Sequence, residues 1–243
     1  MTDPLRIAMW SGPRNISTAM LRAFGNRPDT AVTDEPLYGF YLRQTGLDHP
    51  GREEVIAAQP ESWEVVADHL CGLVPEAQSV WYQKHMSHHL LPEIGQNWLD
   101  RLTNCFLIRD PREVLASYTQ VRETVTLNDT GLPQQAALFE QIYERTGMTP
   151  LVLESKDVLR DPRKLLTLFC NAVGITFSDS MLSWPPGPRP TDGVWSKYWY
   201  ASVEGSTGFV AYKPKKVELT DELEALAEIC MPYYRMLHKH RLG

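Results

Sequence analysis

The chain has 243 residues, of which 43% are hydrophobic and 22% charged, and its formal net charge at pH 7 is −6. This composition is typical of a globular protein, and no Gly/Ser tract, charge block or repeat divides it, so we expect one domain over residues 1–243. The acidic balance argues against nucleic-acid or anionic-membrane partners, because both need a basic field. Any anionic ligand must therefore be held by local positive charges.

The N-terminal segment MTDPLRIAMWSGP contains only a short apolar run. It predicts neither a signal peptide nor a membrane span, and we expect a cytoplasmic protein. The cysteines lie far apart without a CxxC pair, which favours buried thiols over a disulfide framework or a zinc–thiolate site. They are Cys71, Cys105, Cys170 and Cys230.

The chain begins with a predicted strand over residues 5–10, which a loop with Gly12 and Pro13 joins to a helix. A short strand over 31–33 then ends at Asp34, Glu35 and Pro36. The later predictions are a helix over 53–74, a strand over 80–84 before HMSHH, a strand over 104–108, a helix from Pro111 with the stripe Val114, Leu115, Tyr118 and Val121, a helix over 133–146, a strand over 150–153, a helix over 161–173 before Gly174, and a final helix over 221–237.

Alternating strands and helices predict an α/β fold with a central parallel sheet between helical layers, that is, three layers α/β/α. Ligands of such folds bind beyond the carboxyl ends of the strands. This rule gathers the segments 11–18, 34–36, 84–89 and 109–112. The proline-rich segment 184–192 and the aromatic segment 194–200 predict a long surface loop, either a lid or a rigid connector.

The segment WSGPRNIST predicts an anion site, because a loop that leads into a helix offers unpaired N–H groups and the positive end of the helix dipole. Arg14 and the hydroxyls of Ser17 and Thr18 add to it. The Walker glycine and lysine are missing, which disfavours an ATP or GTP site. The alternative is an ordinary capped helix with a surface arginine.

Arg109 ends an apolar strand, where its planar guanidinium suits a phosphate. Ser117, eight residues further, lies beside the apolar stripe of the next helix and can face the same strand edge. The alternative for Arg109 is a salt bridge with Asp110 or Glu113.

The motifs SGPRNIST, DEP, FLIRDPREVLASY and LESKDVLRDPRKLLTLFCNAVGI, in this order, resemble the sulfotransferase superfamily. The resemblance implies a P-loop NTPase-like architecture and 3′-phosphoadenylyl sulfate (PAPS) as donor, with PAP as product and no metal. It places the 5′-phosphosulfate on the first loop, the 3′-phosphate on Arg109 and Ser117, and a closing element at Gly205 and Gly208. The first-loop residues are Gly12, Pro13, Arg14, Asn15, Ile16, Ser17 and Thr18.

Sulfuryl transfer needs a group that offsets charge on the leaving phosphate and a base for the acceptor proton. We expect Arg14 in the first role. The resemblance implies Glu35 as base, with His85 as its rival beside His88 and His89. The alternatives are structural: Glu35 paired with Arg14 or Arg112, the histidines as polar strand-end residues, or a zinc site at HxxHH.

The sequence therefore predicts a PAPS-dependent sulfotransferase that acts on a hydroxyl or amine of a small-molecule or carbohydrate acceptor. Two alternatives remain. One is a degenerate P-loop nucleotide kinase or hydrolase, in which Asp110 holds magnesium. The other is a nucleotide-binding module without catalysis. No heptad seam stands out, and the oligomeric state stays open.

Overall fold

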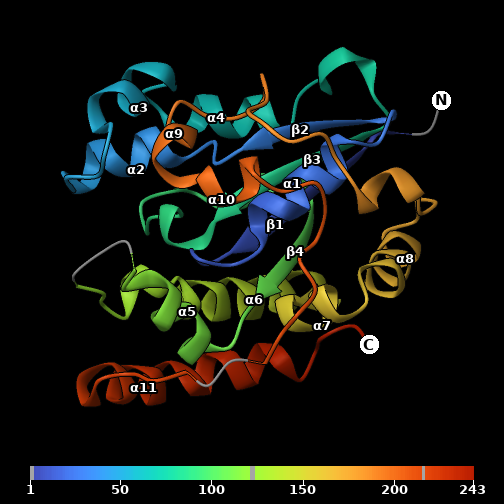
Figure 1. Ribbon diagram of the computed structural model, residues 1–243. Coiled ribbons are helices and arrows are strands. Elements are labelled where there is room, and N and C mark those ends of the chain that lie inside the picture. The colour runs from blue at the N-terminus through green and yellow to red at the C-terminus, as the bar shows by residue number, and fades with distance from the viewer. Residues whose placement is uncertain (1–2, 121–123, 215–216) are drawn as a thin grey trace. The chain divides into compact units, whose positions relative to one another are not determined.

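The computed structural model describes residues 3–120, 124–214 and 217–243 (Figure 1). Within them, five strands form one sheet in the order β2-β3-β1-β4-β5. The pairs β2–β3 and β4–β5 are parallel. The strands are β1 (Leu5–Ser11), β2 (Thr30–Asp34), β3 (Val80–Met86), β4 (Thr103–Ile108) and β5 (Leu151–Glu154). The predicted α/β fold with a central parallel sheet flanked by helices is confirmed.

The helices fill the intervals between the strands and the C-terminal part of the chain. They are α1 (Ser17–Gly25), α2 (Tyr38–Thr45), α3 (Arg52–Ala58), α4 (Trp63–Leu70), α5 (Pro111–Tyr118), α6 (Leu132–Thr146), α7 (Ser155–Arg160), α8 (Pro162–Ala172), α9 (Ser196–Trp199), α10 (Ala201–Glu204) and α11 (Asp221–His238).

The single helix predicted over residues 53–74 is wrong, because the segment forms two helices, α3 and α4. Gln59 precedes Pro60 and is extended, with φ −126° and ψ 154°, as steric conflict with a following proline demands. Ser62 then caps α4 by accepting a hydrogen bond from the Glu64 N–H. Helices α2, α7, α9 and α10 were not predicted, and α9 lies inside the segment 194–200 that was expected to be loop. Val121 lies outside the described residues.

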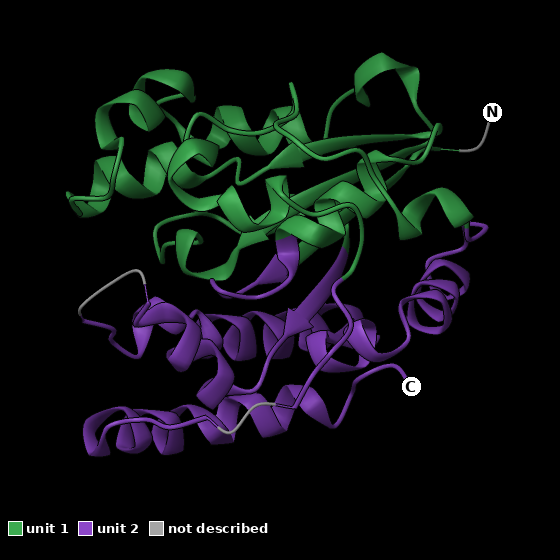
Figure 2. Cartoon of the chain, in the orientation of Figure 1, with its two compact units in different colours: residues 1–9, 18–103, 178–209 green, residues 10–17, 104–177, 210–243 purple. Residues whose placement is uncertain are grey.

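The chain divides into two compact units, shown in different colours in Figure 2. Unit 1 comprises residues 1–9, 18–103 and 178–209, and unit 2 comprises residues 10–17, 104–177 and 210–243. In unit 1, Phe24 of α1 stacks on Tyr82 of β3 with ring centroids 4.2 Å apart. In unit 2, Phe106 of β4 meets Phe139 of α6, and α11 packs along α5 and α6 (Figure 1). Each unit therefore has apolar packing of its own.

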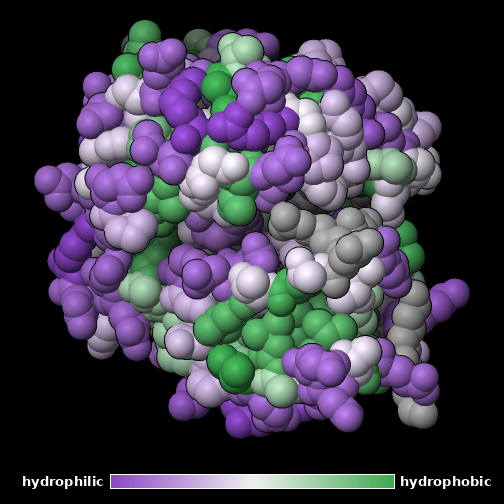
Figure 3. Space-filling model, turned by 90° about the vertical axis from the view of Figure 1, so that its left-hand side faces the viewer, coloured by the Kyte–Doolittle hydropathy of each residue, from purple (hydrophilic) through white to green (hydrophobic). Residues whose placement is uncertain are grey.

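Apolar side chains are mostly inside, and Figure 3 shows hydrophilic residues over most of one face, with an apolar area in the lower half of the view. All four cysteines are buried and free, as the sequence predicts. Among the described residues, no helix has the length and apolar character needed to cross a membrane.

Candidate functional site

The loop between β1 and α1 is held in unit 2 by close backbone packing and by Asn15. A Cβ on Gly12 would stand 2.2 Å from the carbonyl oxygen of Thr130, so only glycine fits there. The Asn15 side-chain nitrogen donates to the Leu107 carbonyl oxygen at 2.9 Å. Its side-chain oxygen accepts from the Ile16 N–H at 3.0 Å. The loop therefore has a defined path before helix α1 begins.

Helix α1 starts at Ser17, so the predicted hydroxyl residues Ser17 and Thr18 occupy its first two positions. The first turn contains no acidic residue. No carboxylate of that turn therefore competes for the free N–H groups and the positive end of the helix dipole. This helix start has the properties of an anion site.

Arg14, Arg109 and Ser117 come together in unit 2, although they lie on different elements. Nε of Arg14 donates to Oγ of Ser117 at 3.1 Å, and Nη1 of Arg109 donates to the Arg14 carbonyl oxygen at 2.7 Å. Arg14 itself adopts a left-handed φ of 55°. Burial and the neighbouring Arg109 lower the pKa of Arg14. The positive charge of Arg109 is thus near enough to act on that of Arg14, and two such cations favour a bound anion.

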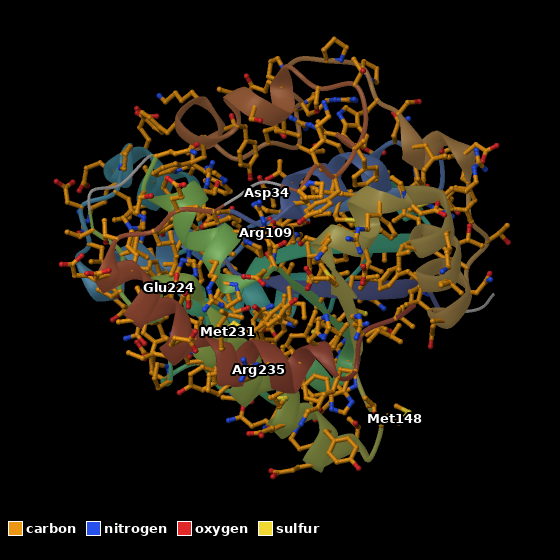
Figure 4. The ribbon with its side chains drawn as sticks, turned by 60° about the horizontal axis from the view of Figure 1, so that its bottom comes forward. Asp34, Arg109, Met148, Glu224, Met231 and Arg235 are labelled. Carbon is orange, nitrogen blue, oxygen red and sulfur yellow. The ribbon has the colours of Figure 1, made fainter. Side chains whose placement is uncertain are left out.

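Arg109 has the salt-bridge partner that the sequence offered as an alternative, Glu113. Its Nε lies 3.1 Å from Oε2 of Glu113, and the Tyr212 hydroxyl donates to the other carboxylate oxygen at 2.8 Å. The pair is partly exposed, with 25% and 21% of the two side chains accessible. Nη2 of Arg109 has no hydrogen-bond partner among the described residues. Arg109, labelled in Figure 4 after the end of β4, thus keeps a donor for a further acceptor.

Asp110, the magnesium ligand of the kinase alternative, caps helix α5 instead. Its Oδ1 accepts from the Arg112 N–H at 2.9 Å. Arg112 is neutralised in turn by Glu224, labelled on helix α11 in Figure 4, and by Glu228. No group of three or more His, Cys, Asp or Glu side chains suited to a metal ion occurs in the described part of the chain.

Glu35 lies in unit 1, where it forms a buried cluster with three side chains. Nζ of Lys84 donates to Oε1 of Glu35 at 2.5 Å and to Oδ1 of Asp34 at 2.8 Å. The Tyr200 hydroxyl accepts from the same nitrogen at 2.7 Å and donates to Oδ2 of Asp34 at 2.6 Å. The partner of Glu35 is therefore Lys84, which the sequence did not suggest.

The strand-end rule gathers residues 34–36 and 84–89, but the sequence predicts no role in this cluster for Lys84, Asp34 or Tyr200. A signal for two of them was present, since a lysine inside the predicted strand over residues 80–84, after Val80, Trp81 and Tyr82, is unusual and needs a buried partner. In the parallel pairing of β2 and β3, Asp34 stands opposite Lys84. No local sequence pattern indicates Tyr200, which is 116 residues from Lys84 in the sequence.

His85, inside β3, and His89, which follows it, are buried in unit 1 near aromatic rings. Burial lowers the pKa of His85 to about 3, and its Nε2 lies 3.3 Å from Oε1 of Gln83. The His89 ring is stacked on Tyr38 and on Tyr41, with ring centroids 4.6 Å apart in both pairs. Burial also lowers the pKa of His89. These side chains are neutral core residues at physiological pH.

The two glycines of the expected closing element lie in the last segment of unit 1. Gly205 ends helix α10 and is exposed. Gly208 forms an isolated antiparallel bridge with Ser183, and a Cβ there would stand 2.9 Å from the Leu182 carbonyl oxygen. Close backbone packing thus accounts for glycine at 208, and a nucleotide-closing role for both glycines stays a prediction.

One comparison with known proteins identifies the family of the chain. The model of the family described as "Sulfotransferase domain" matches residues 5–241. Two Arabidopsis thaliana proteins, branched-chain-amino-acid aminotransferase-like proteins 1 and 2, are 36% and 32% identical to the chain over 99% and 96% of its length. The chain covers 43% and 41% of these relatives, less than half of their length.

Solved structures show the same fold at low identity. The sulfotransferase from Alicyclobacillus acidocaldarius has a TM-score of 0.59 at 14% identity, with 100% of this chain and 98% of that chain covered. The sulfotransferase domain of the Synechococcus PCC 7002 olefin synthase has a TM-score of 0.51 at 18% identity, with 94% and 95% covered.

Proposed function

Because the chain belongs to the sulfotransferase family, we propose that it transfers a sulfuryl group from PAPS to a hydroxyl or amine of a small-molecule or carbohydrate acceptor. The observation that carries this proposal is the convergence of Arg14, Arg109 and Ser117 in unit 2. Two guanidinium groups and a hydroxyl suit a ligand with more than one phosphate. The aminotransferase-like names belong to relatives more than twice as long as this chain, and they assign no chemistry to it.

The proposed donor contacts divide between the loop and the strand end. The N–H groups and hydroxyls of Gly12 to Thr18 hold the 5′-phosphosulfate, and the open Nη2 of Arg109 with Ser117 holds the 3′-phosphate. Arg14, bound to Ser117, offsets the charge that develops on the leaving phosphate during in-line transfer. Arginine supplies these charges, so the proposal requires no metal.

Glu35 is the base that we favour for the acceptor proton. Its side chain is 12% exposed and keeps one oxygen on Lys84, whereas His85 is 1% exposed with a pKa of about 3. A group with so low a pKa takes up a proton poorly at neutral pH. The position of Asp110 as a helix cap supports sulfuryl transfer over the kinase alternative.

Calorimetric titration with PAP, compared with ATP plus magnesium and with AMP, tests the function. We expect PAP to bind tightest, and Arg109→Ala to weaken it about 10- to 100-fold, because one charge-assisted phosphate contact is lost. Arg112→Ala is the matched control: this arginine is three residues away and bound to Glu224 and Glu228, so PAP affinity should stay unchanged.

Glu35→Gln should also keep PAP affinity, and it should lower turnover about 10²- to 10⁴-fold with an acceptor that the wild type sulfurylates. ATP binding equal to or stronger than PAP binding would contradict the proposed function. Equal PAP losses in Arg109→Ala and Arg112→Ala would contradict the assignment of the 3′-phosphate.

A further inference from the structure

The ammonium group of Lys84 is the centre of the cluster in unit 1. It donates to Asp34, Glu35 and Tyr200 at 2.8, 2.5 and 2.7 Å, which uses all three of its N–H bonds. The Lys84 and Asp34 side chains are each 1% exposed, and the Glu35 side chain is 12% exposed. Of the two carboxylates that share this ammonium, Glu35 alone reaches solvent to a measurable degree.

We propose that Lys84 is a positioning residue for Glu35: its ammonium group fixes one carboxylate oxygen and places a positive charge beside it, so that the other oxygen serves as the base. This inference rests on the proposed function, because Glu35 is a base only if the protein transfers a group to a hydroxyl or amine.

The backbone supports the same arrangement. Glu35 has a left-handed φ of 40°, which a residue with a Cβ adopts only when its surroundings hold it there. Its N–H donates to the Lys84 carbonyl oxygen at 2.9 Å, and its own carbonyl oxygen accepts from Nε2 of Gln59 at 2.9 Å. Lys84 therefore holds Glu35 at both the main chain and the side chain.

The charges of the cluster act on Glu35 in opposite directions. Burial raises the pKa of Glu35, Lys84 opposes this, and the second carboxylate, Asp34, raises it further. Burial alone would lower the pKa of Lys84, but the two carboxylates hold it well above its ordinary value. Burial and Asp34 raise the pKa of Tyr200, which stays a neutral phenol. Removing the Lys84 side chain leaves the two carboxylates without their shared cation. Removing the charge of Asp34 takes away the second carboxylate that competes with Glu35 for the Lys84 ammonium group.

The test is a titration of the Glu35 carboxyl by NMR, in protein labelled with ¹³C at the glutamate carboxyl carbons and without donor or acceptor. The signal that disappears in Glu35→Gln is that of Glu35. We expect Lys84→Met to raise its midpoint by about one pH unit or more and Asp34→Asn to lower it. Lys197→Met is the control, because Lys197 lies in the same unit on an exposed pair with Glu54, and the midpoint should not move.

A well-folded Lys84→Met that leaves the midpoint where the wild type has it would overturn the proposal. An upward shift in Asp34→Asn would overturn it too, and this variant decides the matter if Lys84→Met does not fold. The titration needs no nucleotide, so its result is separate from PAP binding. If the protein fails to bind PAP but shows both shifts, the proposed function is contradicted, whereas the coupling between Lys84 and Glu35 is supported.

Discussion

Two buried ionisable side chains have pKa values displaced far enough to make stability depend on pH. Burial raises the pKa of Glu154 to about 8, and nearby acidic residues add to this, although the Tyr234 hydroxyl donates to it at 3.1 Å. Burial lowers the pKa of His85 to about 3. Glu154 is in unit 2 and His85 in unit 1, so each unit contains a titrating group in its interior.

Glu154→Gln should reduce the amount by which the free energy of unfolding falls as the pH rises. Folded wild type keeps the Glu154 proton up to about pH 8, whereas the unfolded chain releases it near 4.5. The folded state thus binds more protons between these values, and the free energy of unfolding falls as pH rises through that window. We expect the wild type to lose about 2 to 4 kcal/mol relative to Glu154→Gln between pH 5 and pH 8 in urea unfolding. If the free energies of unfolding of wild type and Glu154→Gln changed in parallel with pH, Glu154 would not be buried in its protonated form.

His85→Gln should change the pH dependence of stability in the opposite direction from Glu154→Gln. The unfolded chain binds the His85 proton below about pH 6.5 and the folded chain does so only near 3, so wild-type stability falls as pH drops through this range. In urea unfolding, His85→Gln should therefore reduce the fall in unfolding free energy below about pH 6.5 and leave the stability above that pH unchanged.

The sequence allows two interpretations of the proline-rich segment 184–192, as a lid or as a rigid connector. The structure favours the connector. Arg22 of helix α1 holds Asp192 with two bonds of 2.6 and 2.7 Å, and the two side chains are 3% and 2% exposed. Oδ2 of Asp192 also accepts from the Arg189 N–H at 2.7 Å. A buried bidentate pair at its end ties this segment to α1.

Arg22→Met should destabilise the protein by about 3 to 5 kcal/mol, because it leaves the Asp192 carboxylate buried without its cation. The double variant Arg22→Met with Asp192→Leu should recover much of this loss, since no lone charge is left inside. Urea unfolding of wild type, single and double variants measures both effects. A loss below about 1 kcal/mol in the single variant would indicate that the segment is free to move.

The whole chain combines two compact units with one family match, which covers residues 5–241 and thus parts of both. Strand β1 contributes residues 5–9 to unit 1 and residues 10–11 to unit 2. The single domain and the cytoplasmic location expected from the sequence stay predictions.

Calorimetric unfolding tests the single domain. We expect one transition, with equal calorimetric and van't Hoff enthalpies, because five strands share one sheet and β1 belongs to both units. Two resolved transitions, or a van't Hoff enthalpy near half the calorimetric one, would show that the units unfold separately.

The sequence by itself determined the strands, the residues that end them and five helices, α1, α5, α6, α8 and α11. Apolar runs and proline positions are local signals, and they placed Glu35 after β2 and Arg109 after β4. They failed at residues 53–74, where Pro60 outweighs helical periodicity.

The tertiary structure alone decided which side chains meet. Arg14 and Ser117 are 103 residues apart in sequence, and Lys84 and Tyr200 are 116 apart. A periodic pattern fixes the face of an element and not its partner, because the partner depends on how distant elements pack. The base candidate could thus be named from the sequence, whereas its ammonium partner Lys84 required the fold.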